Sequence, residues 1–427
     1  MNKNRGISTT IAGVVIVIAL VIGAAGGYFL APAKIQEVQV TQPKLKGVLN
    51  IGAALPLTGD LATYGENARV ALNLALQEIN TLLNQTNAGY QLNIIYEDTQ
   101  TKPDVALTKT QSLASKGCQV ILGYYSSGEL RNCQTYATTN QLVLISPSST
   151  AISLAIDKPY IFRFCPADDK QGPAMARGMV SLGISHIVSI WRGDTYGDGL
   201  VNSTQTKFAA LGGTYDSAGI RYDINAVEHS TEVALLAQKV QSTVDLYGAS
   251  TVAVYAVTFE EIVSIMTAAN QYPILSQVKW FGSDGAALSD KVIKDATVAN
   301  FSVTTRFPST YFAPTFSSNL EKVRDYVNQT LGRTADPYAL GMYDELWVVA
   351  KCIGFTQQYT GSSINKALKT MAGLTFGSTG WIQLDQFGDR SIGDYQFWEV
   401  YAVNSTTFNW KLSGLYTATS DAVTWYP

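Results

Sequence analysis

Short apolar runs of strand length alternate along the chain with longer segments in which apolar residues recur every three or four positions. Val48–Leu55 and Gln91–Tyr96 have the length and composition of buried strands, and Pro103 stands where a helix's first turn tolerates proline. The helix that Gly65 opens carries one apolar face, made of Ala68, Leu72, Ala75, Ile79, Leu82 and Leu83. Strands alternating with amphipathic helices predict a parallel sheet covered by helices on both faces.

The same pattern restarts after an extended run at Tyr160–Phe164. Helices are predicted at Gly172–Leu182, Leu200–Leu211, Thr231–Tyr247 and Glu260–Gln271, and strands at His186–Ile190, Tyr215–Tyr222, Thr251–Val257 and Val278–Phe281. The junction 163–173 carries two prolines and two adjacent acids, as a crossover between lobes would. Phe301–Thr305 and Phe376–Gly380 are predicted as short extended pieces that form the second and third crossovers. Three crossovers would make a hinge.

The predicted fold class is therefore α/β, with two lobes joined by three crossovers. The first lobe takes residues 47–164 and 305–376, and the second takes 165–304 and 377–427.

The N-terminal 33 residues differ from the rest of the chain. Ile11–Leu30 is a run of 20 apolar residues, about 30 Å long as a helix, which is enough to cross a bilayer. Lys3 and Arg5 precede it, so the positive-inside rule places the remainder of the chain outside the cytoplasm. Asn4–Ser8 also resembles the processing site of archaeal pilin-like signal peptides, which leave the apolar helix on the mature protein.

A secretory signal peptide cleaved after Ala31-Pro32-Ala33 is the alternative, although its apolar core would normally be only about 7–15 residues long. We predict a signal or membrane anchor at 1–33 and a tether at 34–46 that hold the protein at the cell surface. Five Asn-x-Ser/Thr sequons agree with that location, at Asn84, Asn202, Asn300, Asn328 and Asn404.

Composition excludes several classes of function. Only 15% of the 427 residues are charged and the net charge is −3, so no basic face is available for nucleic acid. Two histidines and four cysteines, none at metal-ligand spacing, predict neither a metal nor another cofactor. The cysteines could pair outside the cytoplasm, with three possible connectivities that the sequence leaves open, at Cys118, Cys133, Cys165 and Cys352.

The stretch Gln119–Thr150 holds the first candidate chemistry. Two short apolar strands in it, Val120–Gly123 and Leu142–Ile145, each end in hydroxyl side chains, which are Ser126 and Ser127 after the first, and Ser146, Ser148, Ser149 and Thr150 after the second. Ligands of open parallel sheets bind beyond the carboxyl ends of strands, where helix N-termini favour anions. A carboxylate would fit there. The alternative is that these hydroxyls only cap helices.

Four aromatic residues and one acid stand in loops or at element ends. The aromatic residues are Tyr64, Tyr196, Phe259 and Tyr338, and each could equally fill a core or lie on the surface. Asp284 directly follows a predicted strand, in Phe281-Gly282-Ser283-Asp284-Gly285. It could be a ligand contact, or it could only form an Asx turn or a helix cap.

Over residues 47–402 the chain carries an ordered set of motifs, which are PLTG, TYGE, ILGYYSSGEL, LISPSST, FRFCPADDKQGP, DTYGDG, WFGSDG, PYAL and LDQFGDRSIGDYQFWEV. This set resembles the leucine/isoleucine/valine-binding proteins that serve ABC transporters, which have the type I periplasmic binding protein fold. The resemblance implies two Rossmann-like lobes joined by three crossovers and closing over a ligand. Where many members have a Gly-rich turn with a Tyr, this chain has Val257-Thr258-Phe259, which changes the pocket.

The resemblance also implies roles for the candidate residues. Ser126 and Thr150 match hydroxyls that hold the α-carboxylate of an amino acid, and Ser148 matches a main-chain partner of its ammonium. Asp284 is similar to the acid that binds this ammonium. The tyrosines match the walls of the side-chain pocket.

The expected function is therefore capture of an aliphatic amino acid for an ABC permease, with the membrane contacted through the N-terminal helix. Proteins of this fold also bind amides, urea and aromatic acids, and some could be sensory or structural ectodomains. An enzyme is not expected, because no serine has a histidine or lysine placed by a motif to activate it and GxSxG is absent.

Overall fold

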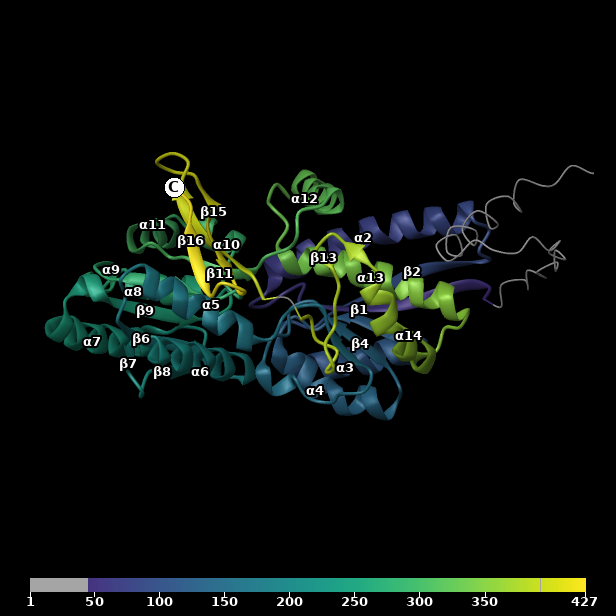
Figure 1. The fold of residues 1–427 in the computed structure, drawn as a ribbon, viewed down its shortest axis with the longest axis horizontal. Helices are drawn as coiled ribbons and strands as arrows, with labels where there is room; N and C mark the ends of the chain where they lie inside the picture. Colours follow the sequence, from purple (N-terminus) through teal and green to yellow (C-terminus); the bar gives the residue numbers. More distant parts are fainter. Residues whose placement is uncertain (1–44, 392) are drawn as a thin grey trace, which may run out of the picture. The chain divides into compact units, whose positions relative to one another are not determined.

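The computed structural model describes residues 45–391 and 393–427. The predicted anchor at 1–33 and nearly all of the tether at 34–46 lie outside the described residues. In the part that is described, no helix is long and apolar enough to cross a membrane. The described residues belong to one compact unit, which contains two main sheets (Figure 1).

The first sheet is entirely parallel and has the strand order β2-β1-β3-β4-β5. Its strands are β1 (Gly47–Leu55), β2 (Tyr90–Asp98), β3 (Val120–Gly123), β4 (Val143–Ser146) and β5 (Ile161–Arg163). β3 and β4 are buried along their whole length, which explains why they read as unbroken apolar runs.

Helices cover both faces of this sheet. The helices of this lobe are α2 (Ala62–Gln85), α3 (Pro103–Ser115), α4 (Ser127–Thr139), α12 (Ser318–Leu331), α13 (Pro337–Thr356) and α14 (Gly361–Gly373). Figure 1 shows α2 and α13 side by side over one face, while α3 packs with α4 over the other. Alternate strand residues enter separate cores, since Leu122 packs with the α2 side and Ile121 with the α3 side.

The second sheet has the order β16-β15-β14-β11-β10-β9-β6-β7, with β8 also paired to β6. The strands up to β11 are parallel, namely β6 (His186–Arg192), β7 (Thr214–Tyr215), β8 (Ile220–Tyr222), β9 (Val252–Val257), β10 (Lys279–Gly282) and β11 (Ser309–Phe312). Three antiparallel strands then extend it, β14 (Tyr395–Ala402), β15 (Phe408–Thr417) and β16 (Ala422–Trp425). The lobe's helices are α5 (Asp168–Ser181), α6 (Thr195–Ala210), α7 (Ser230–Tyr247), α8 (Ile262–Ala269), α9 (Pro273–Ser276), α10 (Asp290–Lys294) and α11 (Ala296–Thr305).

The chain passes three times between the two sheets, which is the number of crossovers that the sequence predicted. The passages are 164–167 after β5, 313–317 after β11, and 382–394 before β14. The prediction of an extended crossover at Phe301–Thr305 is wrong, because these residues end helix α11. The side chain of Asp295 caps that helix, and β11 still pairs within the second sheet, so the second passage comes later.

Two smaller predictions also change. The strand expected at Tyr215–Tyr222 is interrupted, because a turn at 216–219 separates β7 from β8. The extended piece at Phe376–Gly380 is a short hairpin of β12 (Phe376–Gly377) and β13 (Gly380–Trp381). The four cysteines, for which pairing was left open, are all free and buried.

Candidate functional site

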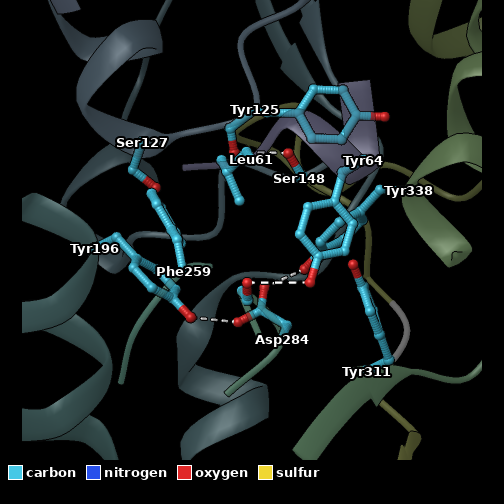
Figure 2. A pocket seen from close by; sticks show the side chains of 11 residues that line it. Leu61, Tyr64, Tyr125, Ser127, Ser148, Tyr196, Phe259, Asp284, Tyr311 and Tyr338 are labelled. Atoms are coloured by element: carbon cyan, nitrogen blue, oxygen red, sulfur yellow. Dashed lines mark hydrogen bonds between the residues drawn. The ribbon is translucent and has the colours of Figure 1, made fainter. Parts of the chain in front are cut away.

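Asp284 lies beyond the end of β10 and is the polar centre of a small cavity between the two lobes (Figure 2). Its side chain is buried and accepts hydrogen bonds on both oxygens. Tyr196 Oη donates to Oδ1 at 2.5 Å and Gln171 Nε2 donates to the same oxygen at 2.8 Å. Tyr338 Oη donates to Oδ2. Because Tyr338 begins α13 and Tyr196 begins α6, hydroxyls from both lobes meet on one carboxylate.

Burial raises the pKa of Asp284 above the ordinary value for an aspartate, and the hydrogen bonds from Tyr196, Tyr338 and Gln171 offset that rise only in part. A second buried carboxyl group, Asp168, interacts with Asp284, and its own pKa is raised well above the ordinary value, first by burial and then by the charge of Asp284. Neither oxygen of Asp168 has a hydrogen-bond partner among the described residues. A cation delivered to the cavity would be stabilised by the Asp284 carboxylate.

The first lobe contributes the start of α4 and the loop after β4. Ser127 and Ser148 line the cavity. Ser127 Oγ accepts a hydrogen bond from the Ala151 amide at 3.1 Å, so its own proton is free to be donated. Ser148 Oγ donates to the Tyr125 carbonyl at 2.7 Å, so it can still accept. The amides of Ser127 and Gly128, at the first two positions of α4, have no acceptor within the helix.

Three other predicted hydroxyl residues do not line the cavity, namely Ser126, Ser149 and Thr150. Ser126 is the N-cap of α4, and its Oγ accepts a hydrogen bond from the Glu129 amide at 3.2 Å. In return, Glu129 Oε2 accepts from the Ser126 amide at 2.7 Å, which completes a capping box. In this structure Ser126 therefore caps a helix, as the alternative interpretation of the sequence allowed.

Replacing Ser126 by alanine is expected to lower the free energy of unfolding by about 1 kcal/mol, because one N-terminal amide of α4 loses its acceptor. Denaturant titration of the full chain measures this loss. Ser115→Ala provides the control, since Ser115 is exposed and only bonds back to its own helix. Equal stability of the two variants would contradict the capping role.

Aromatic rings enclose the cavity, and all four of the predicted ones are among them (Figure 2). Phe259 stacks on Tyr196 with ring centroids 5.2 Å apart, and the guanidinium of Arg192 lies 3.6 Å from the centre of the Phe259 ring. Tyr64 reaches across from α2 and donates to the carbonyl oxygens of Gly285 and Ala287, at 3.1 and 2.9 Å.

Sequence reasoning missed four lining residues and one partner of Asp284. The lining residues are Leu61, Tyr125, Gly285 and Tyr311, and the partner is Gln171. Only glycine fits at position 285, because a Cβ there would lie 2.4 Å from the carbonyl oxygen of Thr258. Tyr125 directly follows the strand that the sequence singled out, so its position was a usable indication.

The cavity is closed around these side chains and holds only about 10 Å³, roughly the space for one water. Hydrogen bonds between the lobes keep it closed, including Tyr338 to Asp284 and Thr63 to Glu260. A larger ligand therefore requires the lobes or the tyrosines to move apart. In the described part of the chain no group of three or more possible metal ligands is found.

Comparisons with known proteins agree with this architecture. The family model described as periplasmic binding protein matches residues 48–399. The chain is similar to "Uncharacterized protein MJ1266" of Methanocaldococcus jannaschii, with 31% identity over 422 residues that cover 94% of this chain and 97% of that protein. It is also similar to "Leu/Ile/Val-binding protein homolog 2" of Brucella abortus, with 27% identity over 164 residues, 38% of this chain and 44% of that one.

Among solved structures, the fold is similar to that of a leucine-binding protein, LivK, from Thermotoga maritima. The TM-score is 0.70 at 18% identity, and the match covers 87% of this chain and 99% of that one. The predicted α/β fold of the type I periplasmic binding proteins is thereby confirmed.

Proposed function

This chain belongs to the periplasmic binding protein family, and we propose that it is the extracytoplasmic substrate-binding protein of an ABC transporter, with an aliphatic amino acid as its ligand. The observation that carries the choice of ligand is Asp284, a buried carboxylate at the junction of the lobes. A buried charge without a counter-charge is costly, so this position suits a ligand that carries a cation.

The opposite end of the cavity suits the α-carboxylate. The amides of Ser127 and Gly128 and the free proton of Ser127 can donate to it, and the positive end of the α4 dipole favours it. A zwitterion would then bridge the lobes, with its carboxylate on the first and its ammonium on the second. The aromatic walls would take its side chain.

Ligand entry would follow opening of the lobes about the three passages, and closure would deliver the ligand to a permease. The cavity of about 10 Å³ must widen for any amino acid. In the closed complex the ammonium would take over the acceptor that Tyr196 and Tyr338 now share. Contacts to both lobes would then make binding favour closure.

Aromatic acids are the second candidate, because six aromatic rings line the cavity, those of Tyr64, Tyr125, Tyr196, Phe259, Tyr311 and Tyr338. An aromatic acid without an amino group would bring an anion towards Asp284 and Asp168 with nothing to offset their charge. The buried acids therefore favour the amino acid.

A thermal-shift screen of the full chain against amino acids, amides, urea and benzoate tests the proposal. A ligand at one hundred times its Kd adds about 2.7 kcal/mol of stability, and we expect aliphatic amino acids to give this shift. Stabilisation by benzoate or urea and by no amino acid would overturn the choice of ligand.

Binding of the amino acid is expected to weaken as the pH falls. Because burial raises the pKa of Asp284, the unliganded protein holds a proton there at a higher pH than an exposed aspartate would, whereas the ammonium needs the carboxylate form. Below that pKa each ligand must displace one proton, so Kd rises by up to about tenfold per pH unit. Calorimetric titration at several pH values measures this, and a constant Kd across the acid range would contradict it.

The stability of the unliganded fold depends on the Asp284 proton with the opposite sign, since this contribution falls as the pH rises. Because its folded pKa lies above the unfolded one, its contribution to stability is present below the unfolded pKa and is lost as the pH rises through the folded pKa.

We also propose that the apolar segment Ile11–Leu30 keeps the protein on the cell surface. Membrane fractionation of the native host tests this, and recovery mainly in the medium would contradict it.

A further inference from the structure

A second cavity lies away from the cleft that contains Asp284, between helix α12 and the second lobe. It measures about 820 Å³, within the range of about 300–1,000 Å³ that small-molecule sites occupy. One wall comes from α12 and the loop after it, and the other from α10 and the β14–β15 hairpin. Figure 1 shows α12 over α2, apart from α10 and β15. The two cavities share none of their lining residues.

The α12 wall is one strip of that helix. Leu320, Val323 and Val327 are its buried residues, and α12 packs against α2 of the first lobe. Arg324 and Asn328 are one residue further along the helix than Val323 and Val327, so they occupy the adjoining strip and face the cavity. Because α12 buries its apolar face against the first lobe, the neighbouring strip that carries Arg324 faces the cavity.

Arg324 is the basic residue of this cavity that lacks a counter-charge. The other two are paired, because Lys294 lies 2.5 Å from Asp290 Oδ2, and Arg333 lies 2.6 Å from Glu66 and 3.2 Å from Asp290. Among the described residues, Arg324 forms no ion pair, and its Nε and Nη2 have no hydrogen-bond partner although they are shielded from solvent. Burial also lowers the pKa of its guanidinium, which an anion beside it would restore.

The opposite wall carries three aromatic rings among the polar side chains of α10 and the β14–β15 hairpin. Trp398, Phe408 and Trp410 line it, and the indole Nε1 of Trp410 donates to the Ser289 carbonyl at 3.0 Å, which fixes that ring against the start of α10. A ligand here would meet a guanidinium on one side and aromatic rings on the other. The planar guanidinium fork matches the two oxygens of a carboxylate or phosphate group.

We propose that this cavity is a second binding site, for a small molecule that carries an oxyanion group on an apolar body. Arg324 binds the oxyanion, and Trp398 and Trp410 contact the apolar part. Since α12 belongs to the first lobe and α10 and β15 to the second, the bound molecule contacts both lobes.

Titration of the full chain with benzoate, followed by tryptophan fluorescence and calorimetry, tests the site. We expect saturable binding that Arg324→Ala weakens by at least about tenfold, the value of a lost charged hydrogen bond. Arg324→Lys keeps the positive charge but loses the planar, two-pronged guanidinium, so its Kd for benzoate should lie between those of the wild type and Arg324→Ala. The Arg324 side chain makes no hydrogen bond to the rest of the described chain, so the melting temperature of the variant should match the wild type.

Asp284→Ala is the control for Arg324→Ala, because it changes the cavity in the cleft and leaves the second cavity intact. Benzoate binding that Asp284→Ala changes and Arg324→Ala leaves unchanged would place benzoate in the cleft and overturn this proposal, as would no saturation at millimolar benzoate. Inorganic phosphate serves as the second probe. Displacement of benzoate by phosphate shows that the oxyanion suffices, and its failure to displace benzoate shows that the apolar body is also needed. Amino-acid binding is measured separately, so failure of one proposal does not mimic failure of the other.

Discussion

Asp284→Ala is expected to abolish detectable amino-acid binding, with a loss of about 3 kcal/mol or more. An ammonium enclosed between the lobes loses its water, and without the carboxylate it becomes a buried charge with no partner. Asp284→Asn keeps an acceptor but not the charge, so it should weaken binding of an uncharged amide less than binding of a zwitterion. Calorimetric titration of both variants with amino acids and amides measures the difference.

The unliganded Asp284→Ala protein should melt close to the wild type, because two changes oppose each other. Tyr196 and Tyr338 lose their acceptor and Gln171 keeps only Thr310, while a buried carboxylate whose pKa is raised is removed. Tyr311→Phe is the matched control in the same cavity, since its hydroxyl has no partner within the described part of the chain. Wild-type affinity in Asp284→Ala would remove this residue from the site and most of the case for an amino acid.

The sequence predicted most of the fold because local periodicity and tertiary burial agree. β3, β4 and β9 are buried along their whole length and read as apolar runs, while α2 shows a single apolar face. The antiparallel end of the second sheet was not predicted as strands. There β15 alternates only loosely between buried and exposed residues, and a register shift interrupts β14 at Phe397 and Trp398.

The prediction at Phe301–Thr305 failed for a physical reason. Phe301, Val303, Thr304 and Thr305 favour strands by propensity. They are helical because Asp295 caps the helix with two side-chain hydrogen bonds and because Val298, Ala299, Phe301, Ser302 and Thr305 are buried on it. Tertiary burial thus outweighed local preference.

The sequence allowed us to predict those cavity residues that directly follow a strand of the sheet. Ser127, Ser148 and Asp284 follow β3, β4 and β10, and the cavity contains all three. Ser126 shows the limit of that reasoning. Glu129 three positions later is the mark of a capping box and was present in the sequence, but a hydroxyl before a helix can serve a ligand or a cap. Tyr311 could not be found, because its ring meets Tyr338 only through tertiary packing.

Asp389→Ala is expected to destabilise the fold strongly, with a loss of about 3–5 kcal/mol in the free energy of unfolding. Asp389 lies in the third passage and joins it to the first lobe. Arg163 donates to both of its oxygens, at 2.7 and 2.5 Å, and Lys158 Nζ lies 2.7 Å from Oδ1. The side chains of both basic residues are 0% exposed and that of Asp389 is 2% exposed. Removing the acid therefore leaves two buried cations without a counter-charge.

Denaturant titration of the full chain measures the loss, and Asp169→Ala is the control. The ion pair of Asp169 with Lys170 is exposed, so its removal should cost less than about 1 kcal/mol. The triple variant Lys158→Met, Arg163→Met and Asp389→Leu should recover stability relative to Asp389→Ala, because it removes the cations together with the acid. If Asp389→Ala were no less stable than Asp169→Ala, the buried ion pairs would not be what holds the third passage against β5.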